Sequence, residues 1–442
     1  MDDLLRLITL QDSNTRTVLF GAAALGLSAG VVGCFAVLRR RALLGDAVAH
    51  SALPGVCAAF LVVGDRSMPA FLLGALVFGA LAVVCISAIQ SATRVKADAA
   101  IAIVLTAFFG LGIVMSQRIM ADPGGGNRAG LDSFLFGKAA SMVRADAMLI
   151  ASVGLVVVLI VLAFFKELKL LAFDRTFAAG IGRPVGAMDL ALMLLICVVT
   201  VIGLPAVGVV LMVALLVIPA AAARFWTESL SVMLIIAGVV GAASGVVGTG
   251  VSALAEGVSA GPVIALAAAA MFTLSMLAAP RRGLIASWHR ARTLRRRILL
   301  ENLLRALYEL DEAAAMSQSN GREGELALKR SWTASQLSGA IARARRLGLI
   351  EPGSGTITLT ASGAAAAAGI VRRHRLWELF LIEQAAIAPD HVDRDADAIE
   401  HVLPPELLTQ LEARLAELGR HPKPVPPSPH AISPFDKAGA LG

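Results

Sequence analysis

The chain has 442 residues, a hydrophobic content of 57% and a formal net charge of +7, and its mean hydropathy is +0.76. This composition is too apolar for an ordinary soluble protein and indicates a polytopic membrane protein. Long apolar runs continue only as far as Pro280, and the remaining residues have the charged composition of a globular domain. We therefore expect two domains, with the boundary at Pro280-Arg281-Arg282.

The first domain contains nine apolar runs that are long enough to cross a membrane. We expect spans at residues 18–38, 42–63, 68–90, 99–116, 148–165, 186–203, 207–223, 230–250 and 262–279. Most basic residues between these runs fall on one side, which the positive-inside rule assigns to the cytoplasm. The amino terminus is then outside and the charged tail is inside.

One stretch of the second span carries polar residues where apolar ones are expected. Asp46 and His50 follow the basic run Arg39-Arg40-Arg41 and lie four residues apart, on one face of a helix. His50 would lie about 13 Å beyond Arg41, near the middle of a hydrocarbon core about 30 Å thick. Intramembrane ionisable residues usually mark a functional site, and this nitrogen and oxygen pair suits Mn²⁺, Fe²⁺ or Zn²⁺. The alternative is that both residues cap or pair locally at the helix entrance.

A loop on the expected cytoplasmic side, residues 173–184, has the composition of a short surface helix ended by glycines. Such a helix could dock into another protein, although a solvated connector is the alternative. The residues of interest are Phe173, Asp174, Ala179, Gly180 and Gly182.

The first domain resembles the membrane permeases of manganese, zinc and iron ABC transporters. The resemblance rests on matching segments along the whole domain, namely Leu44-Gly-Asp46 through His50, Leu53-Pro-Gly55-Val56, Leu135-Phe136-Gly137, Phe173-Asp174 with Ala179-Gly180, and Val207-Gly-Val through Ile218-Pro219-Ala. It implies a paired or homodimeric channel in the bacterial cytoplasmic membrane, which accepts a divalent ion from an extracytoplasmic binding protein. It also implies that Asp46 and His50 hold the ion in the permeation path and that the 173–182 loop contacts the ATPase.

The chain lacks a Gly-x-x-x-x-Gly-Lys-[Ser/Thr] loop. ATP hydrolysis is therefore expected on a separate subunit, and the permease itself is not expected to be an enzyme. Two ligands leave Mn²⁺ or Zn²⁺ under-coordinated, so a symmetric partner is expected to supply a second Asp and His.

The second domain opens with a basic segment, and its next part has the order of a winged helix-turn-helix. We expect a helix at 327–331, a second helix at 333–347 and a small hairpin over 348–360. The second helix carries Arg343, Arg345 and Arg346, which could contact phosphates, but it is poor in the Asn and Gln that read bases. Nucleic acid is thus a doubtful partner, and a helix-turn-helix used only for packing is the alternative.

The last part of the chain carries a second His and carboxylate pattern. His374 and Glu378 share one face of a helix, and Asp393 precedes a group of Asp397, Glu400 and His401 on a second helix. This oxygen-rich set suits a divalent ion, although a solvated charged face is an equal alternative on the residues alone.

This part resembles metal-dependent repressors of the diphtheria-toxin-repressor type. The resemblance rests on Thr358-Leu-Thr-Ala-Ser-Gly363, on Arg373-His374-Arg-Leu-Trp-Glu378-Leu-Phe-Leu and on Ile399-Glu400-His401-Val402-Leu. It implies that His374, Glu378 and Asp393 belong to one metal site, and that Asp397, Glu400 and His401 belong to the adjacent one. Asn302 stands where the family has a further ligand, and Asp397 stands where iron-type members have cysteine, which favours Mn²⁺.

We therefore expect an all-α membrane protein of about eight or nine spans, followed by a cytoplasmic winged helix and a helical metal-binding and dimerisation domain. The expected boundaries are 1–280 for the permease, 281–298 for a basic linker helix, 299–365 for the winged helix, and 366–442 for the metal-binding helices and a Pro-rich tail. The expected function is a divalent-metal permease subunit with a metal-sensing domain. A membrane-tethered, metal-dependent transcriptional regulator is the alternative, and a proton-driven carrier that needs no ATPase is a third.

Overall fold

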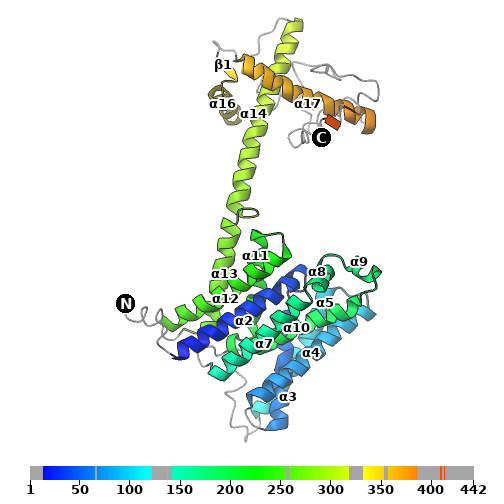
Figure 1. The fold of residues 1–442 in the computed structure, drawn as a ribbon, viewed down its shortest axis with the longest axis vertical. Coiled ribbons are helices and arrows are strands. Elements are labelled where there is room, and N and C mark those ends of the chain that lie inside the picture. The colour runs from blue at the N-terminus through cyan, green and yellow to red at the C-terminus, as the bar shows by residue number, and fades with distance from the viewer. Residues whose placement is uncertain are drawn as a thin grey trace. The chain divides into compact units, whose positions relative to one another are not determined.

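The computed structural model describes residues 13–64, 67–121, 137, 142–254, 258–317, 332–352, 357–385, 409, 410 and 413 (Figure 1). The chain divides into two units, Met1–Ser287 and Trp288–Gly442. The Asp393, Asp397, Glu400 and His401 positions lie outside the described residues, as does the expected helix at 327–331.

The first unit is entirely helical in its described part. Its elements are α2 (Ser13–Leu38), α3 (Leu44–Val63), α4 (Met68–Ala92), α5 (Ala97–Ala121), α7 (Arg144–Ala163), α8 (Phe165–Phe173), α9 (Arg175–Gly180), α10 (Val185–Val207), α11 (Val209–Trp226), α12 (Leu230–Leu254) and α13 (Ala260–Ala278).

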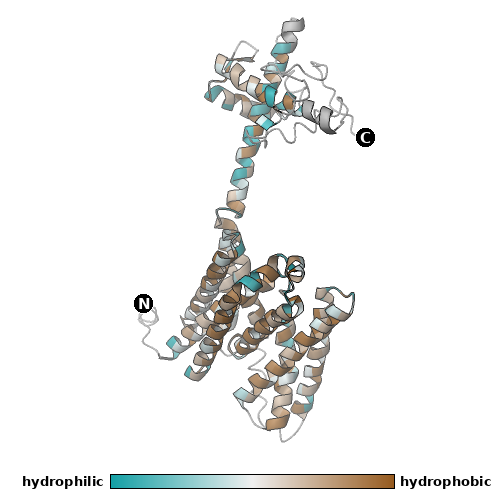
Figure 2. Ribbon diagram, turned by 45° about the vertical axis from the view of Figure 1, so that its right-hand side comes forward, coloured by the Kyte–Doolittle hydropathy of each residue, from teal (hydrophilic) through white to brown (hydrophobic). Residues whose placement is uncertain are grey.

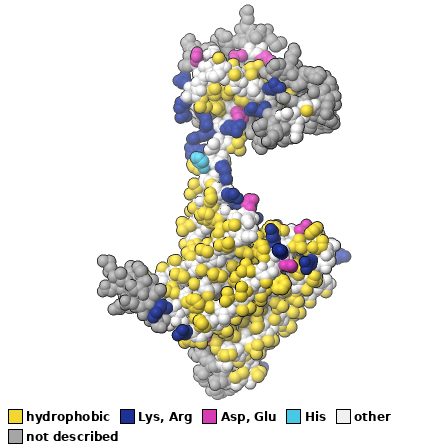
Figure 3. Space-filling view, in the orientation of Figure 1, with side chains coloured by type: hydrophobic (Ala, Val, Ile, Leu, Met, Phe, Trp, Pro, Cys, Tyr) yellow, Lys and Arg dark blue, Asp and Glu magenta, His cyan; other side chains and the backbone are white. Residues whose placement is uncertain are grey.

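Eight of the described helices are long and apolar enough to cross a membrane. The helices of the first unit are mostly in the brown of hydrophobic residues in Figure 2, and hydrophobic side chains cover most of its surface in Figure 3. The ninth expected span corresponds to α11, which has 18 residues. Such a helix is about 27 Å long, slightly shorter than the hydrocarbon core. The prediction of eight or nine spans is therefore confirmed.

Small residues set the closest helix packing in this unit. Gly26 of α2 and Gly241 of α12 approach so closely that a Cβ atom on either would collide with the backbone carbonyl of the other. Gly55 of α3 and Gly74 of α4 meet in the same way. Because lipid supplies no hydrophobic drive between helices, backbone approach of this kind is a main source of their association.

Helix α3 begins at Leu44, directly after the arginine run, and ends at Gly64 in the left-handed conformation (φ 71°). It continues through Pro54, so the proline does not break the span. One face of α3 is buried against the bundle, while Asp46 and His50 lie on a partly exposed face. The two polar side chains therefore lie on the less buried face of α3.

The second unit contains α14 (Leu284–Ser317), which begins shortly before the unit boundary, α16 (Ala334–Arg346), β1 (Ile350–Pro352), β2 (Ile357–Leu359) and α17 (Ala361–Ala385). Its core includes the stripe of Leu303, Leu307 and Leu310 on α14, spaced as one helical face. The sequence predicts a separate linker helix over 281–298, but α14 runs through this boundary as one helix. Its sequence has no Pro or Gly that would interrupt it.

The hairpin expected after α16 is present. Strands β1 and β2 are antiparallel, with Ile350 opposite Leu359 and Pro352 opposite Ile357. Helix α16 starts with a capping box, in which Thr333 and Gln336 satisfy each other's backbone N–H groups. A helix followed by a hairpin agrees with part of a winged helix. The full motif stays a prediction, because its first helix is outside the described residues.

Candidate functional site

The first candidate site is the Asp46 and His50 pair on α3. His50 Nε2 lies 3.3 Å from Asp46 Oδ1, and the two side chains are 25% and 34% exposed. The His50 ring also meets the edge of Phe109 on α5, with 4.8 Å between ring centroids. His50 Nδ1 is buried and has no hydrogen-bond partner among the described residues. The two side chains thus share one face of the helix, as their spacing predicts, and their contact also fits the alternative of a local pair at the helix entrance.

This pair offers one imidazole and one carboxylate to a divalent ion. No described group of three or more His, Cys, Asp and Glu side chains is placed to hold a metal ion. Mn²⁺ and Zn²⁺ take at least four donors. The described residues of this chain therefore supply only part of a coordination shell at this site.

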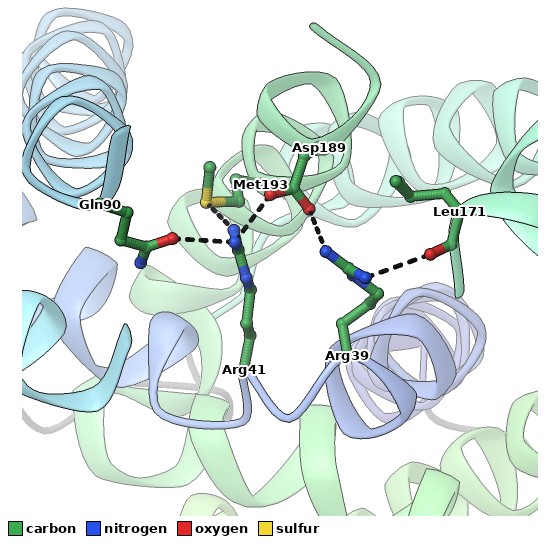
Figure 4. Close-up of polar contacts among 6 residues, drawn as sticks. All are labelled: Arg39, Arg41, Gln90, Leu171, Asp189 and Met193. Carbon is green, nitrogen blue, oxygen red and sulfur yellow. Dashed lines mark hydrogen bonds and ion pairs between the residues drawn. The ribbon is translucent and has the colours of Figure 1, made fainter. Parts of the chain in front are cut away.

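The arginine run that precedes α3 forms a buried ion-pair network that sequence analysis missed. Arg39 Nη2 and Arg41 Nη2 lie 3.1 and 2.7 Å from the two carboxylate oxygens of Asp189 on α10. Arg41 also donates to Gln90 Oε1 of α4 at 2.9 Å, and Arg39 donates to the Leu171 carbonyl of α8 at 3.1 Å (Figure 4). The network thus ties the entrance of α3 to α4, α8 and α10.

The network places two guanidiniums and one carboxylate at the turn between α2 and α3. Burial lowers the pKa of Arg41, and the Asp189 carboxylate opposes that shift. Arg40, between the two paired arginines, has a positive φ of 54°. The sequence feature that could have predicted this network is Asp189, a carboxylate inside the apolar helix α10. The positive-inside rule used the arginines only to assign the cytoplasmic side of the membrane.

The second candidate site is the turn between α8 and α9. Asp174 Oδ1 accepts a hydrogen bond from the Phe177 amide at 2.8 Å and so caps α9. These local hydrogen bonds, first that from the Phe177 amide, lower the pKa of Asp174. Three apolar side chains in this turn are exposed, namely Phe173, Phe177 and Ile181.

The expectation of a short helix in this loop is confirmed, and it ends at Gly180. Gly182 follows with a φ of 78°, a conformation that favours glycine. Phe173 ends α8, Phe177 lies in α9 and Ile181 follows α9, and we call these three exposed side chains the apolar ridge. Sequence analysis named Phe173 but missed the other two members of the ridge.

The third candidate site is the His374 and Glu378 pair of α17. His374 Nε2 lies 3.0 Å from Glu378 Oε1, and the two side chains are 2% and 0% exposed. The other ring nitrogen, Nδ1, lies 2.9 Å from Arg305 Nη1 of α14. Sequence analysis named the pair but missed Arg305.

The arginines of α16 lie at its carboxyl end. Arg343 is half-buried, while Arg345 and Arg346 are exposed. Arg343 and Arg346 also line a hollow of about 470 Å³ between α14 and α16, together with Arg296 of α14. Their role in binding phosphates stays a prediction.

Comparison with known proteins identifies the first unit. Residues 11–279 match the ABC 3 transport family. The chain belongs to this family. Residues 360–426 match a second domain, described as "Iron dependent repressor, metal binding and dimerisation domain". Together, the matches show a metal ABC permease with a fused C-terminal repressor-like domain.

The relatives of this ABC 3 permease include transporter subunits for two metals. It is 41% identical to the manganese transport system membrane protein MntC of Bacillus subtilis (strain 168), over 94% of this chain and 95% of that protein. It is 42% identical to the zinc transport system membrane protein TroC of Treponema pallidum (strain Nichols), over 66% of this chain and 97% of that protein. The match to MntC extends well beyond the membrane unit, whereas the match to TroC covers two thirds of this chain.

A solved structure supports the fold of the membrane unit. PsaBC from Streptococcus pneumoniae, solved in complex with a Fab, is 33% identical, with a TM-score of 0.55 over 63% of this chain and 97% of that chain. The helical permease architecture predicted from the sequence is therefore confirmed.

Proposed function

We propose that this permease moves a divalent ion of the Mn²⁺ and Zn²⁺ class past Asp46 and His50. The single observation that supports this most strongly is the contact of these two side chains on the partly exposed face of α3. Manganese and zinc are the metals in the names of the relatives. Borderline divalent ions accept both imidazole nitrogen and carboxylate oxygen.

The coordination shell is completed by symmetry in this proposal. A second copy of the chain, related by a two-fold axis, brings its own aspartate and histidine to the ion and raises the protein donors from two to four. When the two copies of this homodimer move apart, the ion keeps only the two ligands of one copy and is bound more weakly. The ion is then released.

The exposed ridge of α8 and α9 is the proposed docking surface for the ATPase subunit. Phe173, Phe177 and Ile181 offer apolar contacts, and Asp174 fixes the start of α9. The chain has no phosphate-binding loop of its own, so ATP hydrolysis belongs to that separate subunit. The Arg39, Arg41 and Asp189 network links this region to the entrance of α3.

The proposed topology follows from the nine helices in chain order. If α11 crosses the bilayer, the helix ends with Arg39, Arg94, Arg224 and Arg281 all fall on the same side. The positive-inside rule makes that side the cytoplasm of a bacterial cell. The ATPase and the C-terminal domain then lie inside, and an extracytoplasmic binding protein delivers the ion from the other side.

Uptake of Mn²⁺ and Zn²⁺ into vesicles that contain the permease, the ATPase and the binding protein tests the site. Removing a residue that hydrogen-bonds to a metal ligand typically lowers the affinity for the metal by about 10- to 100-fold. Removing a ligand itself should therefore reduce metal uptake by more than about 100-fold. Asp46→Ala and His50→Ala should therefore abolish uptake. Glu228→Ala, which removes an exposed carboxylate at a helix end, is the control and should leave uptake near wild type.

Wild-type uptake in both ligand variants would reject the proposed site. Uptake by this chain alone, without the ATPase, would favour the proton-driven carrier instead.

The fused domain is proposed to report the internal metal concentration and to shift the transporter to a resting state. This requires the domain to bind metal differently in the two states. Glu400→Ala and His401→Ala should relieve inhibition of uptake by internal Mn²⁺, and unchanged inhibition would contradict this proposal.

The match to a repressor domain keeps a membrane-tethered regulator as the second candidate function. Tight, salt-tolerant and sequence-specific binding of DNA by the full chain would favour that candidate.

A further inference from the structure

His374 is enclosed by protein groups on both of its ring nitrogens. Nδ1 lies 2.9 Å from Arg305 Nη1, and Nε2 lies 3.0 Å from Glu378 Oε1. Arg305 is itself almost fully buried, with its Nε 2.6 Å from Glu309 Oε1 in the next turn of α14. A continuous chain of polar contacts therefore runs from Glu309 through Arg305 and His374 to Glu378, joining α14 to α17.

The chemistry of arginine decides which tautomer of His374 fits this chain. A guanidinium has five N–H donors and no acceptor. His374 Nδ1 must therefore accept the hydrogen bond from Arg305, and the ring proton sits on Nε2. Nε2 is thus the protonated nitrogen, and it lies 3.0 Å from the Glu378 carboxylate.

This tautomer is the wrong one for a metal ligand at Nε2. A ligating histidine uses the lone pair of one nitrogen and donates the N–H of the other to an acceptor such as a carboxylate or a carbonyl. With a metal on Nε2, the Nδ1 proton of His374 would point at the N–H donors of Arg305. A divalent cation would also lie beside a buried guanidinium, which repels it.

The contrast with His50 sharpens this point. No described donor contacts His50 Nδ1, so nothing in the described residues fixes its tautomer against a metal. The donor set at His374 therefore does not fit the metal that the repressor-like domain implies, although the residue types match.

We propose that Arg305 holds His374 in the tautomer that excludes a metal at Nε2, so that the pair of His374 and Glu378 closes the domain internally and does not bind metal. The Arg305 guanidinium joins α14 to α17 through His374, as a bound cation would otherwise do. A regulatory metal would then have to use the remaining expected residues, Asp393, Asp397, Glu400 and His401. This inference does not depend on the proposed transport site.

The test is a metal count on the purified full-length chain that carries His50→Ala, so that the proposed transport ligand does not contribute. Equilibrium dialysis against Mn²⁺ or Co²⁺ gives the number of ions bound per chain. Adding His374→Ala should leave this number unchanged. A loss of one bound ion per chain would overturn the proposal.

The reciprocal variant is Arg305→Gln. The glutamine carbonyl can accept a hydrogen bond from Nδ1–H, which frees the Nε2 lone pair. This variant should gain one bound ion per chain, and His374→Ala should remove it again. Arg297→Gln is the matched control, since Arg297 makes the same contact with a glutamate four residues on but is 61% exposed. It should gain nothing.

If Arg305→Gln binds no additional ion that His374→Ala removes, Arg305 does not exclude metal from His374, and the proposal is overturned. If Arg305→Gln does not fold, the comparison of His374→Ala and His374→Gln in the chain with Arg305 intact still decides. Both should keep the parent metal count, and a shared loss would overturn the proposal. If transport uses a site other than His50, the starting count rises but these differences stay the same.

Discussion

The molecule contains two pairs of histidine and carboxylate at the same helical spacing. Their contacts are nearly equal, at 3.3 Å for His50 and Asp46 and 3.0 Å for His374 and Glu378. The first pair is partly exposed, and its outer ring nitrogen has no described partner. The second pair is buried, and its outer nitrogen faces an arginine. In our proposals, the group at the outer ring nitrogen of each histidine therefore distinguishes a pair that accepts a cation from a pair that is already closed.

We call the pair of His50 and Asp46 the open pair and the pair of His374 and Glu378 the closed pair. Placing an arginine beside the open pair should make it resemble the closed pair, and we expect the largest effect from this change. Phe109 lies against the His50 ring. Phe109→Arg would bring a group with only N–H donors, and an extra positive charge, to the proposed path of the ion. Vesicle uptake of Mn²⁺ should fall as far as in His50→Ala. Phe109→Leu, which keeps the site apolar, should retain most uptake, and normal uptake by Phe109→Arg would count against our interpretation of the open pair.

The arginines next to α3 should behave as structural groups. Asp189→Asn would leave the Arg39 and Arg41 guanidiniums without their shared buried carboxylate, which typically costs about 3–5 kcal/mol. We expect a matching fall in the free energy of unfolding of the permease in detergent. Glu228→Gln breaks the exposed pair with Arg282 and should cost less than about 1 kcal/mol. Equal effects of the two substitutions would show that the Asp189 network is not a special constraint.

The closed pair should contribute to stability more than the open pair does. Glu378→Ala removes a fully buried carboxylate 3.0 Å from His374 Nε2, and leaving a buried polar group without its partner costs about 1–3 kcal/mol. Thermal unfolding of the C-terminal unit within the full chain, followed by limited proteolysis, measures this loss. His50→Ala should leave the same transition unchanged. A stable Glu378→Ala chain would mean that the pair does not close the domain.

The smallest expected effect concerns Asp174. The pKa of Asp174 in the folded protein lies below its ordinary value. Its charged side chain therefore stabilises α9 at any pH above the ordinary pKa, and this stabilisation is lost only as the pH falls through the lower, folded pKa. Binding of the ATPase subunit should therefore be constant down to about pH 5, which is above the ordinary range of aspartate. Asp174→Asn should weaken this binding by a few-fold at neutral pH. A wild-type affinity that falls steeply between neutral pH and about pH 5 would contradict this assignment.

The sequence predicted the elements and the local pairs well, because these depend on short spacings. Apolar runs gave the spans, and a separation of four residues gave both histidine contacts. The partners that decide what each pair does are distant in the chain. Arg305 and His374 are 69 positions apart, and Arg39 and Asp189 are 150 apart. Periodicity contains no information about such contacts, which arise only from the packing of helices.

The most direct test of the difference between the two pairs is pulsed electron paramagnetic resonance of Mn²⁺ bound to the full-length protein, which detects histidine nitrogen in the coordination shell. In a chain that also carries His401→Ala, so that the expected regulatory site contributes no histidine nitrogen, we predict a nitrogen coupling that disappears in His50→Ala and persists in His374→Ala. A coupling that persists in His50→Ala but disappears in His374→Ala would contradict our account of both sites.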